Sequence, residues 1–191
     1  MNGATGAGKE SSAETRALQS VEAHHAGMLK QLNVLVGLLT EAVEAGDAAA
    51  GQSTQAALLD WCDKELVPHA LAEEGPLYSG PHGMPEAKLL VDGMLAEHQV
   101  IVDLVEELRT ADGVPAAVAA GAIQRIFALH LDKENRLLMP FIVASPGLSL
   151  SRAVEGLHEL VGTGGHAGSH HHAAPHGEEK DRHRHGQHGH G

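Results

Sequence analysis

Two segments of this sequence place a histidine four residues before a glutamate. His69 and Glu73 form the first pair, within HALAEEGPLY, and His130 and Glu134 form the second, within HLDKENRLLMPF. Because residues four apart lie on the same face of an α-helix, each pair predicts an imidazole and a carboxylate side by side. Imidazole nitrogens and carboxylate oxygens are both ligands that transition metals accept. The spacing therefore indicates two parts of a metal site.

A third histidine occupies a position where a helix core would normally hold an apolar residue. His98 follows Met94 and precedes Ile101 and Val105 in steps of three and four residues. This periodicity predicts an amphipathic helix with His98 on its buried face. A histidine in such a position needs a partner inside the protein.

A fourth histidine belongs to an earlier apolar helix. His25 lies three residues before Met28 and seven before Leu32, on the stripe predicted to be buried. Its neighbour His24 is rotated by about 100° around the same helix. We therefore prefer His25 as the inward residue, although the sequence leaves the choice between the two histidines open.

We interpret these four histidines and two glutamates as the ligands of two iron ions in the centre of a helical protein. The alternative for any single histidine is a core residue whose ring nitrogens are satisfied by its neighbours. Four histidines on four helices favour the metal. Burying Glu73 and Glu134 unpaired costs several kcal/mol each, and no Lys or Arg shares their stripes to compensate.

The elements that must position these residues are helices. Apolar residues recur at helical spacing between turn signals such as Gly46-Asp47, Gly75-Pro76 and Asp112-Gly113. Pro68 removes a backbone donor beside His69, so we expect a loosened turn there. The predicted fold is an all-α, up-down-up-down four-helix bundle, with helices at 13–45, 53–74, 85–110 and 115–145 and a short segment at 149–160 that packs back on it.

Both ends of the chain differ in composition from this domain. Residues 1–12 are Gly, Ala, Ser and charged residues, which predict a disordered lead-in to the domain at 13–161. Residues 162–191 are rich in Gly and His and hold nine of the 16 histidines. We interpret them as a disordered, low-complexity tail.

Composition excludes several classes of function. A net charge of -12 and only four Phe, Tyr and Trp residues argue against a nucleic-acid partner. One cysteine, Cys62, excludes an intramolecular disulfide and fits a reducing compartment, so we expect a cytoplasmic protein. The first residues lack the apolar core of a signal peptide, and we expect no membrane-spanning segment because no run of about eighteen apolar residues stands out.

HALAEEGPLY, HLDKENRLLMPF and EHQVI resemble segments of the hemerythrin-like, HHE cation-binding family. The resemblance covers roughly residues 20–145. It implies an up-down four-helix bundle around a non-haem di-iron centre with bridging carboxylates. The positions that correspond to the family's ligands are His25, His69, Glu73, His98, His130 and Glu134.

The sequence also departs from the oxygen-carrying members of that family. Where they have a further histidine and an aspartate, this chain has Val102 and Asn135. The remaining six-ligand set resembles that of the family's iron-sulfur repair proteins and of many bacterial members, some of which are linked to sensing of nitric oxide, peroxide or oxygen. We therefore expect a small gaseous or peroxide ligand, in a stress response or in sensing, rather than reversible oxygen carriage. Glu74 and Glu97 adjoin the motifs and are interpreted as solvated or as partners of the ligands.

Two alternatives remain open. The His-rich tail predicts a storage protein for nickel, zinc or copper in which the helices serve as a scaffold. A ferritin-like site is a structural competitor, because Glu22 precedes His25 and Glu155 precedes His158 by three residues. Tyr78 is either a donor near the iron ions or an ordinary amphipathic residue at the end of the second helix, and we prefer the second interpretation.

Overall fold

The chain is helical throughout the part that the structure describes. The computed structural model describes the backbone of residues 4–164 and the side chains of residues 11–157, and no strand occurs among them. The predicted all-α class is confirmed. The tail predicted at 162–191 lies outside the described residues from residue 165 onward.

Among residues 4–164, four long helical runs follow one another, and two of them contain a π-helical turn. The elements of these runs are α1 (Ala4–Glu44), α2 (Ala48–Trp61), η1 (Cys62–Leu66), α3 (Val67–Glu74), α5 (Pro85–Thr110), α6 (Val114–Lys133), η2 (Glu134–Leu138) and α7 (Met139–Ala144). Two shorter helices, α4 (Ser79–His82) and α8 (Leu150–Gly164), complete the described chain.

The bounds differ from the predicted ones mainly at helix starts. α5 spans the predicted 85–110. α1 begins at Ala4 rather than near Ala13, because adding residues to an existing helix costs far less than nucleating a new one. α2 begins at Ala48 rather than near Ser53, because the Asp47 carboxylate caps it by accepting a hydrogen bond of 2.9 Å from the Ala50 amide.

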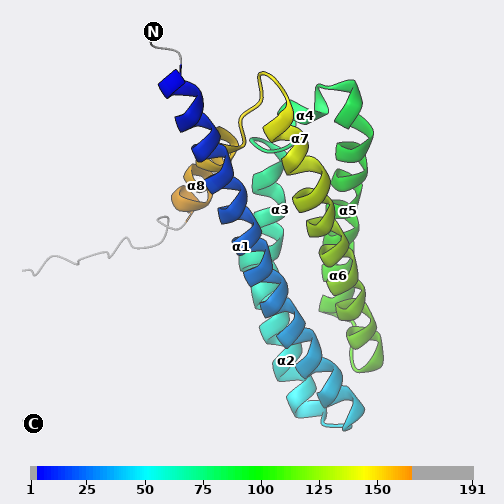
Figure 1. Ribbon diagram of the computed structural model, residues 1–191. Coiled ribbons are helices and arrows are strands. Elements are labelled where there is room, and N and C mark those ends of the chain that lie inside the picture. Colours follow the sequence, from blue (N-terminus) through cyan, green and yellow to red (C-terminus); the bar gives the residue numbers. More distant parts are fainter. Residues whose placement is uncertain (1–3, 165–191) are drawn as a thin grey trace, which may run out of the picture.

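The four runs lie side by side, and each is antiparallel to the run before it (Figure 1). α4 packs on α5, and α8 packs across α1 and α3. The two short helices are additions to the four-helix arrangement that the sequence predicts. The segment expected at 149–160 does return to the other helices as α8, which buries Leu150, Ala153 and Val154.

Both π turns occur two residues before a proline. At η1 the Val67 amide donates to the Cys62 carbonyl, and Pro68 follows. At η2 the Met139 amide donates to the Glu134 carbonyl, and Pro140 follows. Because proline cannot donate an amide hydrogen bond, the preceding turn widens and its amides reach one residue further back. The loosened turn expected near Pro68 is observed, and the second was not predicted.

The π turn at η2 changes which residues are buried after it. A π turn closes its hydrogen bond over one more residue than an α turn, so the buried stripe moves on by one position. Leu137 is 52% exposed, whereas Leu138 is fully buried. Earlier in this run Val118 is also exposed, because α6 meets its neighbours through the small residues Ala116 and Ala119 instead.

Two apolar clusters fill the interior, and the predicted ligands lie between them. Along α1, Val21 belongs to one cluster and Met28 to the other, with His25 between the two. Along α5, Met94 and Ile101 flank His98 in the same way. The helices thus carry a polar layer across an otherwise apolar core.

One helical run, Val114–Ala144, is long and apolar enough to cross a membrane by length and composition alone. The run is not continuously apolar, since Pro115, Gln124 and Arg125 lie within it, so it is weak evidence for a membrane-spanning segment. The core helix of a water-soluble protein passes the same test. This run carries His130 and Glu134, whose side chains are buried against the other helices.

Glu14 of α1 fixes the start of α8. Its carboxylate accepts hydrogen bonds from the Leu150 amide at 2.8 Å and from the hydroxyls of Ser149 and Ser151 at 2.7 and 2.8 Å. The first amides of a helix have no partner within the helix, so this carboxylate caps α8 from another element. Burial acts to raise the pKa of Glu14, but these hydrogen bonds outweigh it and lower the pKa.

We predict that Glu14→Gln weakens the docking of α8. Loss of a helix cap costs about 0.5–2 kcal/mol, so the thermal midpoint of the variant at neutral pH should fall by a few degrees. A lowered folded-state pKa stabilises the protein above the unfolded pKa, and this contribution is lost as pH falls through the folded value. The difference between wild type and variant should therefore shrink below about pH 4, as measured by thermal denaturation at several pH values.

Glu22→Gln provides the matched control, since Glu22 is exposed on the same helix. A difference between wild type and Glu14→Gln that stays constant down to pH 3 would contradict this account of the cap.

Candidate metal centre

The six predicted ligands come from all four helical runs and meet at one level. Their elements are α1 for His25, α3 for His69 and Glu73, α5 for His98, α6 for His130 and η2 for Glu134. Five of them are buried, and the side chain of His69 is 12% exposed. Their potential ligand atoms form two groups, each with all atoms within 4.8 Å of one another, and Glu73 belongs to both groups.

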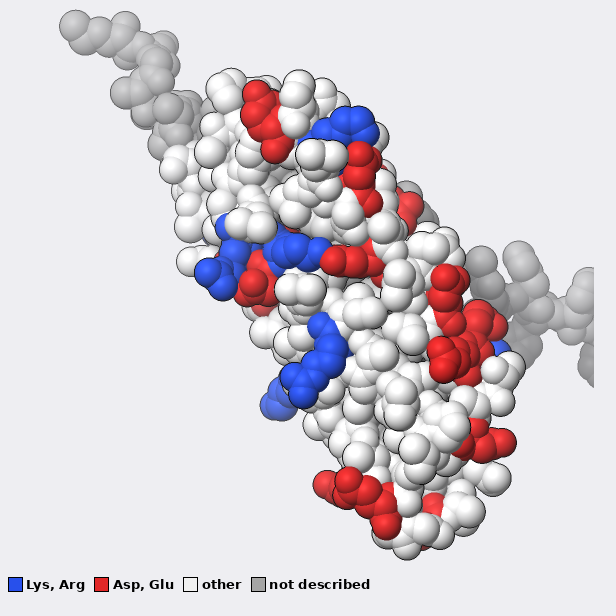
Figure 2. Space-filling view, turned by 90° about the vertical axis from the view of Figure 1, so that its right-hand side faces the viewer, with Lys and Arg blue, Asp and Glu red and all other residues white. Residues whose placement is uncertain are grey.

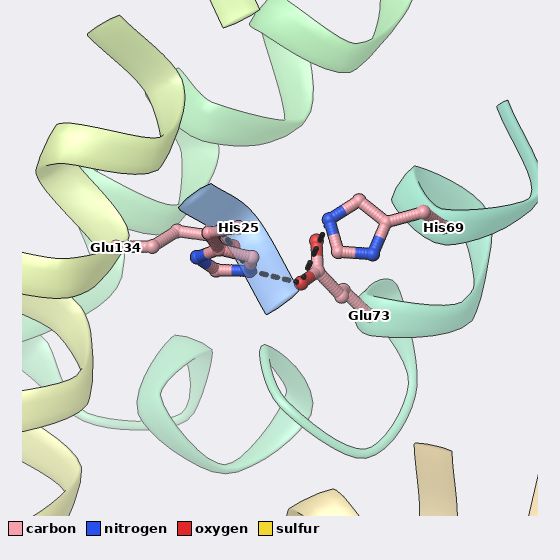
Figure 3. A group of neighbouring side chains, drawn as sticks. All are labelled: His25, His69, Glu73 and Glu134. Carbon is pink, nitrogen blue, oxygen red and sulfur yellow. Dashed lines mark ion pairs between the residues drawn. The ribbon is translucent and has the colours of Figure 1, made fainter. Parts of the chain in front are cut away.

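The first group comprises His25, His69, Glu73 and Glu134. Figure 3 shows these four side chains pointing toward one another from three elements. The Nε2 atom of His25 lies 3.5 Å from an oxygen of each glutamate, and the Nε2 atom of His69 lies 3.3 Å from Glu73 Oε1. These distances leave the nitrogens and oxygens around a common centre.

The second group comprises Glu73, His98 and His130. The two Nε2 atoms of the histidines lie 3.1 Å apart, and that of His130 lies 3.6 Å from Glu134 Oε1. Glu134 therefore borders both groups, as Glu73 does.

In three of the histidines, Nδ1 faces an oxygen outside the centre, and this contact determines whether Nε2, which faces the centre, carries a hydrogen or a lone pair. Nδ1 of His98 faces Glu74 at 3.1 Å, and Nδ1 of His130 faces Glu97 at 3.1 Å. Nδ1 of His25 faces the side-chain oxygen of Asn135 at 2.9 Å. An oxygen in this position takes the hydrogen of Nδ1–H, so each Nε2 presents a lone pair to the centre.

The centre lacks the donors that these lone pairs need. Buried atoms without a hydrogen-bond partner include Nε2 of His25 and His69, both carboxylate oxygens of Glu73 and Oε2 of Glu134. Each unpaired buried polar atom costs about 1–3 kcal/mol. A cation bonded to these atoms removes that cost, and a mixed set of imidazoles and carboxylates fits iron. The residues present thus fit a metal centre.

Burial and charge also favour a cation here. Burial lowers the pKa of His25 and His98, and it lowers that of His69 to about 3, which keeps the imidazoles neutral. Burial and the neighbouring Glu134 raise the pKa of Glu73 well above its usual value. The raised pKa favours a proton on Glu73 because a second buried negative charge beside Glu134 is unfavourable, and a bound cation can take the place of that proton.

Tyr78 lies in the site, although the sequence analysis preferred an ordinary amphipathic role for it over that of a nearby donor. Its hydroxyl donates to Glu134 Oε1 at 2.5 Å, and it lies 3.0 Å from Nε2 of His130 and 3.5 Å from Nε2 of His98. The chain leaves α3 in a wide turn in which the Tyr78 amide donates to the Glu73 carbonyl, and this turn brings the ring over the site. A tyrosine between two ligand motifs, and the sole tyrosine of the sequence, was the available signal.

Of the remaining candidate ligands from the sequence analysis, those whose side chains the structure describes differ from the six in their burial. His24 is exposed, whereas His25 is buried. Glu22 and Glu155 of the ferritin-like alternative are both exposed, so the described part of the chain does not bring them into the centre. His158 has a side chain outside the described residues.

Glu97 and Asn135 act on the ligands from outside the centre. Lys133 forms an ion pair with Glu97, which in turn holds His130. Asn135 stands where oxygen-carrying hemerythrins have an aspartate, and here its side chain orients His25.

Comparison with known proteins agrees with this geometry. The family described as hemerythrin HHE cation binding domain matches residues 16–142, a range that holds all six predicted ligands. No curated protein and no solved structure matches the chain. Since the family match covers more than half of the 191 residues and includes the whole polar layer, the chain belongs to the hemerythrin HHE cation-binding domain family.

Proposed function

We propose that this protein is a hemerythrin-like, non-haem di-iron protein that binds or reacts with a small oxidant, namely oxygen, peroxide or nitric oxide. The observation that carries the proposal is the set of buried imidazole and carboxylate atoms that face one another without donors. His25 and His69 would hold one iron, and His98 and His130 the other. Glu73 and Glu134 would be shared, since each borders both groups.

Bound iron supplies one-electron redox chemistry and coordination positions that a small molecule can take. The chain supplies the surroundings of that chemistry. Two apolar clusters exclude water on either side, and Glu74, Glu97 and Asn135 hold the imidazoles in orientation. Tyr78 holds a proton at its hydroxyl, 2.5 Å from Glu134. Val102 and Asn135 replace two ligand positions of oxygen carriers, which favours reaction or sensing over reversible carriage.

The rest of the proposal concerns the setting of this centre. The domain is proposed to be an up-down-up-down four-helix bundle to which α4 and α8 are added. We propose a cytoplasmic protein with neither membrane nor nucleic acid as partner. On the face shown in Figure 2, acidic and basic side chains form small separate groups without a continuous basic band of the kind that nucleic acids require.

The first prediction from this proposal concerns iron content. Protein reconstituted anaerobically with ferrous iron should hold about two irons per chain, as in di-iron bundles generally. His25→Ala should lose at least half of this iron, because it removes an imidazole that faces both carboxylates. His24→Ala is the matched control, since it removes an exposed imidazole one position away. Elemental analysis of protein purified without affinity resin makes the measurement, and equal iron loss in both variants would refute the assignment.

A second prediction concerns Tyr78. Tyr78→Phe removes only the hydroxyl that donates to Glu134, so the variant should fold and keep its iron. If this hydroxyl supplies a proton to the reacting molecule, peroxide decay should slow by about 100-fold, the usual range for a general acid. Stopped-flow measurement of peroxide loss, with iron content determined in parallel, separates a lost proton donor from a lost metal. An unchanged rate would remove Tyr78 from the reaction.

The second candidate function is storage of nickel, zinc or copper by the His-rich tail. It is favoured by the nine histidines that follow residue 165, which lie outside the described residues. A chain that ends at Gly164 should keep its iron but lose any bound nickel, zinc or copper. Tail-bound metal should also be released below about pH 6, where free imidazoles become protonated. Iron that disappears with the tail would overturn the helical centre as its site.

A further inference from the structure

A cavity of about 170 Å³ leads from the surface to one side of the metal centre. It lies between α1, α3 and α8, and its inner wall includes His25, His69 and Glu73. The unpartnered Nε2 atoms of both histidines and the unpartnered oxygens of Glu73 belong to this wall. His69 is correspondingly the one candidate ligand whose side chain is partly exposed.

The opposite side of the centre is closed in the described part of the chain. His98 and His130 are buried and do not line this cavity. The Tyr78 hydroxyl fills the space beside them, 3.0 Å from His130 Nε2, and the Tyr78 ring stacks on His98. A molecule from solvent therefore reaches the centre from the side of His25 and His69.

The cavity is larger and more apolar than a diatomic gas or hydrogen peroxide requires. Its walls include the side chains of Val21, Met28, Val154 and Leu157, and its lining also includes the exposed residues His24, Lys64 and Glu65. A water molecule takes up about 30 Å³ in the liquid, and an apolar cavity of about 150 Å³ is enough for benzene. The space thus matches a ligand with an apolar group of roughly the size of an aromatic ring.

We propose that this cavity receives the apolar body of a small organic hydroperoxide, with its polar end directed at His25, His69 and Glu73. This assignment rests on the proposed function, which supplies the oxidant class. The inner wall is the side on which solvent reaches the residues that would hold iron, so the hydroperoxide group would face the metal there, and the walls from α1 and α8 match its hydrocarbon part. α8 thereby becomes part of the binding site, since without it Val154 and Leu157 would not line the cavity.

The first test measures binding without any reaction. The probe is 2-phenylpropan-2-ol, the alcohol that corresponds to cumene hydroperoxide and is not itself an oxidant. We expect saturable binding of one probe per iron-loaded full-length chain, measured by calorimetry. Ala72→Phe and Leu157→Trp add bulk to the cavity from α3 and α8, and each should weaken binding at least tenfold, the usual scale for steric discrimination in an apolar pocket.

Glu155→Phe is the matched control, because Glu155 is exposed on α8 and does not line the cavity. It should bind the probe as wild type does. Two filling variants on different elements keep the test decisive if one of them fails to fold. No binding to wild type, or equal binding to wild type and both filling variants, overturns the proposal.

Turnover separates this proposal from the proposed function. The quantity to measure is the rate of cumene hydroperoxide loss divided by the rate of hydrogen peroxide loss. This ratio should be at least tenfold lower in Leu157→Trp than in wild type. An unchanged ratio overturns the hydroperoxide assignment. If wild type consumes neither hydrogen peroxide nor cumene hydroperoxide, both the oxidant chemistry and the hydroperoxide assignment are overturned. In that case the probe-binding test still shows whether the cavity takes an apolar ligand.

Discussion

The structure depends on a layer of buried ligand atoms that the chain alone cannot satisfy. Outer oxygens hold three imidazoles so that their Nε2 lone pairs face inward, and carboxylate oxygens face the same centre. Apolar clusters on both sides remove the water that would otherwise solvate these atoms. In such surroundings electrostatic interactions are stronger than in water, so the layer destabilises the metal-free fold and favours a cation by the same physics.

The backbone around this layer is irregular where the sequence requires it. Each π turn precedes a proline and borders a ligand pair: η1 lies just before His69, and η2 begins at Glu134. Widening a helix by one residue shifts every later side chain on its face. The first π turn therefore affects which residues of α3 face the centre, whereas the second shifts only residues that follow Glu134. The uninterrupted α1 and α5 each contribute a single histidine.

Much of this arrangement was predictable from the sequence because its signals are local. Helical spacing identified the buried faces that carry His25 and His98, and the four-residue spacing placed His130 beside Glu134. The rest depends on contacts between distant segments. Leu137 is exposed because a π turn moves the buried stripe by one residue, and the donor role of Tyr78 was not preferred because the wide turn after α3 that carries its ring to His98 leaves no sign in local spacing. The spacing of residues in the sequence does not indicate where such turns will move a side chain.

The two sides of the centre differ in a way that bears on its chemistry. On one side the Tyr78 hydroxyl lies within hydrogen-bonding distance of Glu134 and His130, in space that solvent does not reach. On the other side a cavity brings outside molecules against His25 and His69. In the proposed function, the oxidant therefore enters on one side of the centre, and the hydroxyl that can donate a proton lies on the other side. A molecule that enters by the cavity meets His25, His69 and Glu73 first, and Glu134 lies between these residues and the tyrosine. The open side is walled in part by α8, and the docking of α8 depends on Glu14, which precedes His25 on α1.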